Sequence, residues 1–191
     1  YPWPGTPPGG YDLWVGVYRA GDGARLPPGD TADRPVEDDR VRIGAIEVGH
    51  SPRQPTADDI GLPIALDADL GPVHLRGAAL MPSGPARPGD AVTVHLLWEV
   101  VDAATGLAGD VRLSLPGAGG ELAGASETLT EAPLCPAPCD WRVGERMRTQ
   151  HTVRVPDTTT PGRHALNVAL ARGSAGGGAM TIGELEVVGA K

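Results

Sequence analysis

Apolar and polar residues alternate along several short stretches of the chain. The clearest run covers residues 91–101, and its expected buried face consists of Val92, Val94, Leu96, Trp98 and Val100. Shorter runs with the same period cover residues 73–76, 111–115 and 147–155. Period-two runs bounded by glycine and proline are typical of antiparallel strands, whereas helical spacing is nearly absent. The sequence therefore predicts an all-β fold in which antiparallel strands form a two-sheet β-sandwich.

One pair of these strands occurs twice in the sequence. Residues 8–18 match residues 161–171, and residues 41–48 match residues 180–187. The expected inward side chains of the first strand correspond one to one in the two copies: Tyr11, Leu13, Val15 and Val17 correspond to His164, Leu166, Val168 and Leu170. We therefore expect two hairpins of the same conformation.

A change of phase marks the second strand of both copies. The alternation shifts by one residue at Gly44 in the first copy and at Gly183 in the second copy. A β-bulge produces this shift, because it inserts one extra residue into one strand of a pair. The pattern thus predicts a bulge at the same place in both hairpins.

The repeat suggests how the chain is divided. Residues 73–191 contain enough strands for a complete sandwich, whereas residues 1–49 hold only the closing hairpin of a partial one. Residues 50–72, rich in proline and aspartate, are expected to be a linker. A two-stranded ribbon is marginally stable alone in water. We therefore expect this hairpin to pack on the 73–191 module, or on another copy as a homodimer formed by hairpin docking or exchange.

Composition and charge narrow the possible partners. The 191 residues include 28 glycines and 20 prolines, and the net charge is −8 without a basic stripe. Nucleic acid is therefore not expected as a partner. No apolar run approaches the ~20 residues of a membrane helix. Because the sequence begins with Tyr1 and not with methionine, we expect a mature form or an excised fragment.

The two cysteines, Cys135 and Cys139, flank a short proline-rich segment. Two thiols alone cannot complete a four-ligand zinc site, and the spacing exceeds that of a Cys-x-x-Cys redox pair. We expect a local disulfide, which is typical of exported proteins, with free thiols as the alternative.

Catalytic and metal-binding patterns are weak. The sequence has no Gly-x-Ser-x-Gly elbow, and its five histidines show no recognised metal spacing. Acidic clusters such as residues 37–39 lack the EF-hand spacing and are expected to be solvated loops. We expect no catalytic residues, no metal and no cofactor, so an enzyme is the least favoured class.

Two aromatic residues stand out from the rest. Trp14 and Tyr18 fall on the face of their strand opposite Leu13 and Val15. Exposed aromatic rings at this spacing suit stacking on a sugar ring or burial against a protein. The alternative is that they form the contact between the hairpin and a neighbouring module. Their candidate ligands are a glycan or another protein domain.

Four motifs together resemble a known family. They are the Pro-Gly-x-Tyr-x-Leu-x-Val-Gly-x-Tyr strand of residues 8–18, the Arg-Ile-Gly-x-Ile-x-Val strand of residues 42–48, and the segments 87–98 and 139–145. The chain resembles the extracytoplasmic Ig-like repeats that follow the transmembrane region of bacterial membrane glycosyltransferases related to the mannosyltransferase superfamily. The resemblance covers nearly all of residues 73–191, and residues 1–49 match the end of a preceding repeat.

The resemblance implies an Ig-like or fibronectin-III-like sandwich without catalytic residues. It also implies an extracytoplasmic location, periplasmic or at the cell surface, in a larger protein that supplies the membrane anchor. His164 and Ala171 depart from the family pattern, which has tyrosines there. The function expected is that of a non-catalytic module for spacing, docking or acceptor contact. The alternative is a carbohydrate-binding module that uses Trp14 and Tyr18.

Overall fold

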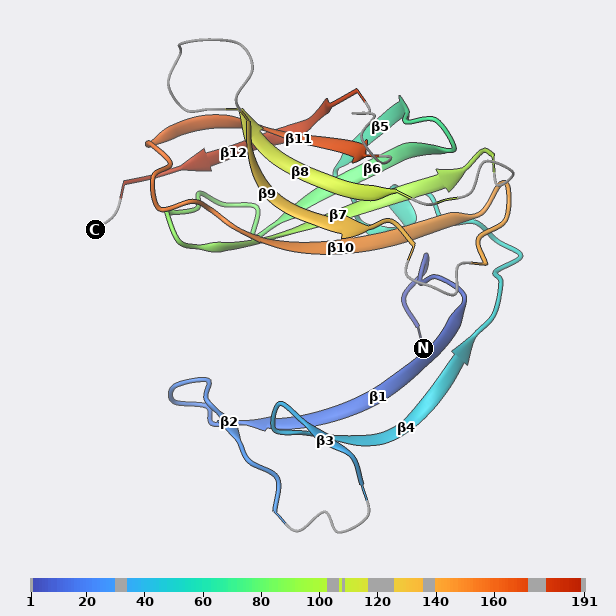
Figure 1. Ribbon diagram of the computed structural model, residues 1–191, viewed down its shortest axis with the longest axis vertical. Helices are drawn as coiled ribbons and strands as arrows, with labels where there is room; N and C mark the ends of the chain where they lie inside the picture. Colours follow the sequence, from blue (N-terminus) through green and yellow to red (C-terminus); the bar gives the residue numbers. More distant parts are fainter. Residues whose placement is uncertain are drawn as a thin grey trace. The chain divides into compact units, whose positions relative to one another are not determined.

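The computed structural model describes residues 2–29, 34–102, 107, 109–116, 126–135, 140–171 and 178–189. The fold is all-β with antiparallel sheets, which confirms the predicted fold class. Among the described residues, one short 3₁₀ turn at Asp58–Ile60 is the helical element. The chain divides into two compact units: unit 1 comprises Tyr1–Pro7 and Ser51–Lys191, and unit 2 comprises Pro8–His50 (Figure 1).

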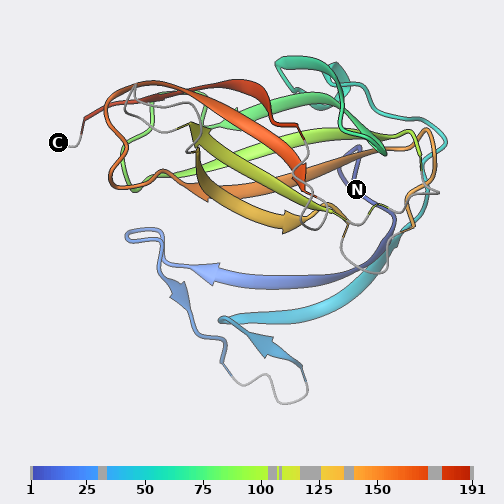
Figure 2. The same cartoon turned by 45° about the horizontal axis from the view of Figure 1, so that its top comes forward.

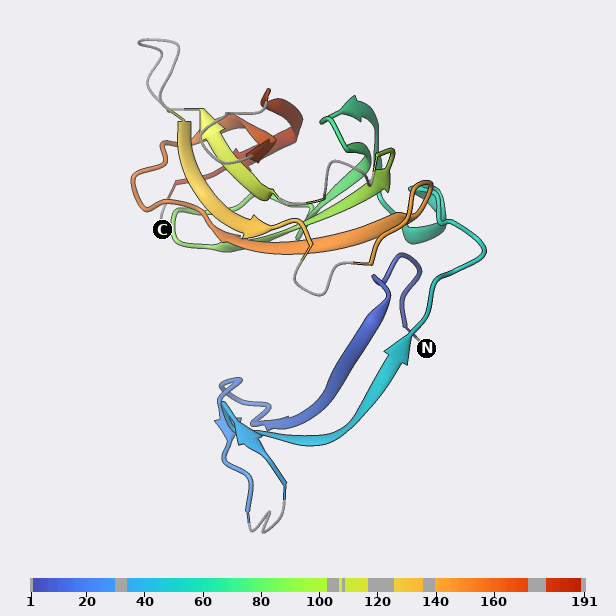
Figure 3. The ribbon, with the colours of Figure 1, turned by 45° about the vertical axis from the view of Figure 1, so that its right-hand side comes forward.

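Unit 2 is a long hairpin with two short accessory strands. Strand β1 (Gly9–Tyr18) pairs with β4 (Arg40–Val48) along nearly its whole length, and the pair forms a curved ribbon (Figure 3). The accessory strands are β2 (Arg25–Leu26) and β3 (Val36–Glu37). The resulting sheet has the order β2-β1-β4-β3.

Unit 1 contains two four-stranded antiparallel sheets, seen as two layers in Figure 2. The first has the order β10-β7-β6-β5 and the second the order β12-β11-β8-β9. The strands are β5 (Ile64–Asp69), β6 (Val73–Met81), β7 (Ala91–Val100), β8 (Asp110–Pro116), β9 (Ser126–Pro133), β10 (Arg146–Arg154), β11 (Gly162–Ala171) and β12 (Met180–Val187).

One hydrophobic core joins these two sheets. Leu96 and Trp98 of β7 are fully buried, and so are Leu113 of β8 and Val168 of β11. These side chains alternate along their strands, as the period-two runs predict. Burial of alternating aliphatic side chains from two facing sheets is what holds a β-sandwich together.

The core contains a short polar chain. The indole N–H of Trp98 donates to Thr149 Oγ1 at 2.8 Å, and Thr149 Oγ1 lies 2.9 Å from Nε2 of His151. A buried indole N–H without an acceptor would destabilise the fold, so Thr149 satisfies it. His151 is 7% exposed.

The segment expected to be a linker, residues 50–72, belongs to unit 1 from Ser51 onward. They contain β5, which pairs with β6, and a segment that covers the outer face of the first sheet. On that face, Leu62 packs with Ala79 and Leu97 in a second small apolar cluster. Gly77 allows this approach, because a Cβ there would lie 2.9 Å from the Cβ of Ala57.

The hairpin domain, expected to cover residues 1–49, corresponds to unit 2 at Pro8–His50, because the first seven residues belong to unit 1. The backbone N–H of Arg148 in β10 donates to the carbonyl of Gly5 at 2.7 Å. The guanidinium carbon of Arg148 lies 4.7 Å from the centroid of the Trp3 ring. The amino-terminal segment is therefore held at the edge of the first sheet.

The outer edge of β12 also carries backbone bonds to a residue outside the strands. Ala86 forms an isolated parallel bridge with Val187. Its N–H donates to the carbonyl of Glu186 at 2.9 Å, and its carbonyl accepts from Val188 at 2.8 Å. Single residues outside the strands thus bond to the edges of both β10 and β12.

The predicted bulges are present in both hairpins. Leu13 pairs with Gly44 and Trp14 pairs with Arg42, so Ile43 is the extra residue. In the second hairpin, Leu166 pairs with Gly183 and Asn167 pairs with Thr181, which leaves Ile182 as the extra residue. The two hairpins therefore share register and bulge position, as the sequence repeat predicts.

Candidate functional site

Trp14 and Tyr18 lie on one face of β1, as the alternation predicts. Their cross-strand partners on that face are Arg42 and Arg25. Trp14 is partly buried, whereas Tyr18 is 55% exposed. We call this side of unit 2 the polar face.

Arginine side chains cover both aromatic rings. The guanidinium carbon of Arg40 lies 5.7 Å from the centroid of the Trp14 ring, and that of Arg25 lies 5.3 Å from the Tyr18 ring. Arg25 Nε also donates to the Tyr18 hydroxyl at 2.9 Å. Cation–π contacts at exposed sites contribute about 0.5–1 kcal/mol. A sugar that stacked on the covered side of either ring would have to displace an arginine.

Further polar contacts tie this face together. Asp38 and Asp39 both have positive φ, 47° and 57°, as a two-residue type I′ turn between β3 and β4 requires. Arg25 donates to the carbonyl of Asp38 at 2.8 Å, and Arg42 pairs with Asp12 at 2.7 Å. The arginines of the polar face are therefore already engaged within unit 2.

The opposite face of unit 2 is apolar and exposed. Cross-strand pairing places aliphatic side chains from all four strands on this side, which we call the apolar face. Its most exposed members are between 36% and 59% accessible: Leu13, Val15, Val17, Leu26, Val36, Ile43 and Ile46. Large contiguous apolar patches on a folded chain mark sites of interaction.

Most of the equivalent face of the β11–β12 hairpin is covered. There, Leu166, Val168 and Ile182 are at most 1% exposed and belong to the core of unit 1. The corresponding residues of unit 2 are 37%, 47% and 51% exposed: Leu13, Val15 and Ile43. Other strands of unit 1 thus cover the apolar face of the β11–β12 hairpin, whereas the described residues of unit 2 include no such strands over the apolar face of β1 and β4.

The apolar face is therefore the candidate functional site. Trp14 and Tyr18, the ligand-binding residues predicted from the sequence, lie on the other face of the same strand, whereas the apolar side was expected to be buried. The sequence repeat indicates this site, because each exposed residue of the apolar face in β1 and β4 corresponds to a buried residue of β11 or β12.

A charged cluster lies on the outer face of the first sheet of unit 1. Glu99 accepts hydrogen bonds from Arg76 Nε at 2.8 Å and from Arg146 Nε at 2.9 Å, and Arg76 also pairs with Asp67. Desolvation raises the pKa of Glu99, but the two arginine hydrogen bonds outweigh it and leave the pKa below its usual value. The backbone N–H of Arg146 donates to Gln54, so this cluster fastens residues 54–55 to the sheet.

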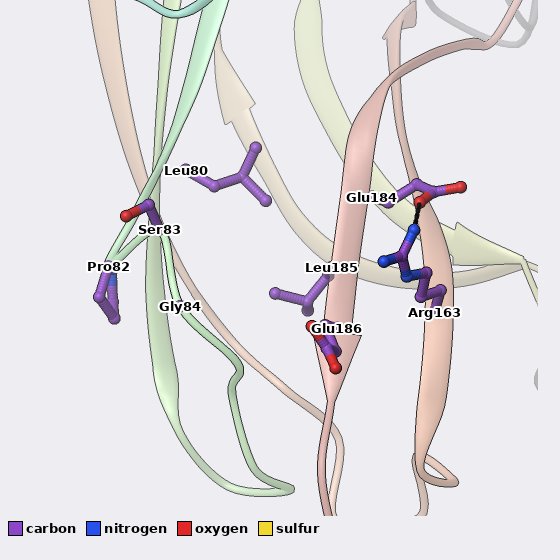
Figure 4. A pocket seen from close by; sticks show the side chains of 8 residues that line it. All are labelled: Leu80, Pro82, Ser83, Gly84, Arg163, Glu184, Leu185 and Glu186. Atoms are coloured by element: carbon purple, nitrogen blue, oxygen red, sulfur yellow. Dashed lines mark hydrogen bonds and ion pairs between the residues drawn. The ribbon is translucent and has the colours of Figure 1, made fainter.

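A small cavity of about 200 Å³ lies in unit 1 between residues 80–84 and the β11–β12 hairpin (Figure 4). Leu80 and Leu185 line its apolar side, and Arg163 pairs with Glu184 at 3.4 Å on its polar side. Ser83 also lines the cavity, but no histidine does. The lining therefore lacks the base that a serine nucleophile needs.

The predicted disulfide falls partly outside the described residues. Cys135 is disulfide-bonded, and its predicted partner Cys139 lies outside the described part of the chain. Within the described ranges, no group of three or more histidine, cysteine, aspartate or glutamate side chains is placed to hold a metal ion. In the same ranges, no helix has the length and apolar character to span a bilayer.

Comparison with known proteins adds no family to this description. No protein-family model matches the sequence, and no curated protein matches it either.

Proposed function

We propose that this chain is a non-catalytic β-sandwich module whose hairpin unit docks onto another protein domain. The observation that carries the proposal is the exposed apolar face of unit 2, since its counterpart in unit 1 is buried. Surfaces of this kind are covered in proteins that stay soluble and active. The module would act by spacing and docking within a larger protein.

The setting proposed for the module is an extracytoplasmic one, in a membrane-anchored protein. Two observations support it: the family resemblance of the sequence motifs, and the disulfide at Cys135, since disulfides persist in oxidising compartments. An Ig-like or fibronectin-III-like topology is part of the same proposal. It is supported by the pairing of β7 with β10, of β8 with β11 and of β11 with β12, as strands B with E, C with F and F with G pair in Ig domains.

Carbohydrate binding through Trp14 and Tyr18 is the competing function. The arginines that lie over both rings weigh against it, because they occupy ring faces that a sugar would use.

Binding of an apolar dye and titration with a panel of sugars distinguish docking from carbohydrate binding. The full chain should enhance the fluorescence of the apolar dye ANS, and the double variant Val15→Asp/Ile43→Asp should lose most of that signal. Titration with mono- and oligosaccharides, followed by tryptophan fluorescence, should give no saturable change. Saturable sugar binding that disappears in Trp14→Ala would overturn the docking function in favour of carbohydrate binding.

A further inference from the structure

We propose that the apolar face of unit 2 closes an incomplete β-sandwich: a partner polypeptide that supplies strands equivalent to β6, β7, β8 and β10 but lacks its own closing hairpin. This inference rests on the docking function proposed above and names the partner's chemistry. The partner would present an inner sheet face of alternating valine and leucine, together with one free strand edge.

The first argument is the identity of the two apolar faces. Four inward positions carry the same residue in both hairpins: Leu13 and Leu166, Val15 and Val168, Ile43 and Ile182, Val48 and Val187. Gly9 and Gly162 begin the two hairpins with φ of 140° and 147°. Because register, bulge and inward side chains agree, the surface that covers one face also fits the other.

The second argument is the free edge of β1. In unit 1, the corresponding edge of β11 pairs with β8 over five residues, from Asn167 to Ala171. In unit 2, β2 pairs with β1 at two residues only, Val17 and Tyr18. Among the described residues, the positions of β1 equivalent to Asn167–Ala169 have no strand beside them on this edge. A strand equivalent to β8 would fit there by strand addition.

The third argument is the size of the apolar face. Its seven exposed members together leave accessible about the surface of three whole aliphatic residues. A stable interface buries about 800 Å² on each partner. Two hairpin faces packed together as a dimer would therefore fall short. An incomplete sandwich supplies both the facing sheet and the strand edge, so it buries more surface and adds backbone hydrogen bonds.

An exchange of strands within the full chain tests this complementarity. Residues Gly162–Leu170 are replaced by the sequence of Gly9–Val17, and residues Met180–Val187 by that of Val41–Val48, with the native loop retained. These exchanges conserve length and leave four inward residues unchanged; the other inward changes are Leu170 and Met180 to valine, Leu185 to isoleucine and His164 to tyrosine. The chimera should unfold cooperatively, with a Tm within about 10 °C of the parent.

The matched control is the same chimera with aspartate at the position that Val15 occupies, which should lose the cooperative transition. Val15→Asp in the original hairpin should leave the transition of unit 1 unchanged. A chimera that fails to fold would overturn the inference but not the docking function, which the sugar and dye measurements test separately.

The oligomeric state tests the competing occupant, a second copy. Sedimentation of the full chain across micromolar concentrations should show a monomer. A dimer that Val15→Asp dissociates would overturn the inference, because the face would then be closed by another copy of this chain.

Discussion

The two hairpins of this chain share their local structure and differ in what covers them. Both have the same register, the same extra isoleucine and nearly the same inward residues. One contributes Leu166 and Val168 to the core of unit 1, whereas the other exposes Leu13 and Val15. The comparison shows that local sequence specifies the shape of the ribbon, whereas the burial of its face depends on strands supplied from elsewhere.

Truncation of equivalent leucines should give the largest contrast. Leu166→Ala should lower the free energy of unfolding of unit 1 by about 2–5 kcal/mol, because it leaves a cavity in a closed core. Leu13→Ala should cost less than about 1 kcal/mol, since Leu13 is 37% exposed. Urea denaturation followed by circular dichroism measures both. Equal losses would contradict the claim that only one face is covered.

The stability of unit 1 should depend on pH through His151. Desolvation by burial lowers the pKa of His151 in the folded chain, so the folded state resists protonation. The contribution of neutral His151 to the free energy of unfolding is complete above the pKa of histidine in the unfolded chain, about 6.5. As the pH falls below that value, this contribution decreases by at most ~1.4 kcal/mol per pH unit.

The variant His151→Gln isolates this contribution. It should flatten the dependence between pH 7 and pH 5, measured as urea midpoints at each pH. Desolvation, followed by the charge of Arg148, also lowers the pKa of His95, so part of the slope should remain. An unchanged slope in the variant would show that His151 is not the titrating group.

Substitution by alanine should affect stability differently at the two bulge glycines, Gly183 and Gly44. A Cβ at Gly183 would lie 3.0 Å from Ile64 Cδ1, whereas a Cβ at Gly44 would have nothing within 4 Å. Gly183→Ala should therefore destabilise unit 1 by about 1 kcal/mol. Gly44→Ala should change stability by less than about 0.5 kcal/mol. Thermal unfolding of the two variants tests the difference, and a larger cost at Gly44 would contradict it.

A substitution on the polar face of unit 2 should have the smallest effect on stability. Arg25→Ala removes the guanidinium over Tyr18 together with its hydrogen bonds to the Tyr18 hydroxyl and the Asp38 carbonyl, and should cost unit 2 about 0.5–1 kcal/mol. Faster hydrogen exchange of the β1 amides would report this loss. Arg19→Ala is the control, because Arg19 pairs with Asp22 at an exposed site. Equal exchange in both variants would show that the contacts of Arg25 do not stabilise unit 2.

Much of this architecture could be predicted because alternation and repetition are local properties of the sequence. The strands containing Val94, Leu113 and Val153 follow from period two alone. The bulge at Gly44 follows from the change of phase, and its repetition at Gly183 supports the assignment.

Strand β5 was missed for a physical reason. It has only three inward residues, and its outward Asp67 and Asp69 look like a solvated loop. In the structure, Asp67 pairs with Arg76 of β6, a contact that depends on the strand register and leaves no periodic signal. The packing of Leu62 on Leu97 is equally invisible, since it joins a segment without regular structure to the outer face of a strand.

The candidate site could be predicted in part. The sequence placed Trp14 and Tyr18 on the side away from the aliphatic residues, and the structure agrees. It did not indicate that Arg40 and Arg25 would lie over the rings, because those contacts depend on the pairing of β1 with β4 and β2.

The bonds from Gly5 to β10 and from Ala86 to β12 have a consequence for self-association. Exposed strand edges template the growth of intermolecular sheets, and proteins that block their edges resist aggregation. Unit 1 blocks two of its edges with single residues that cannot themselves extend into a strand ladder. Cutting away residues 1–7 during recombinant production would unblock β10, and we expect such a trimmed preparation to precipitate more readily than the intact chain.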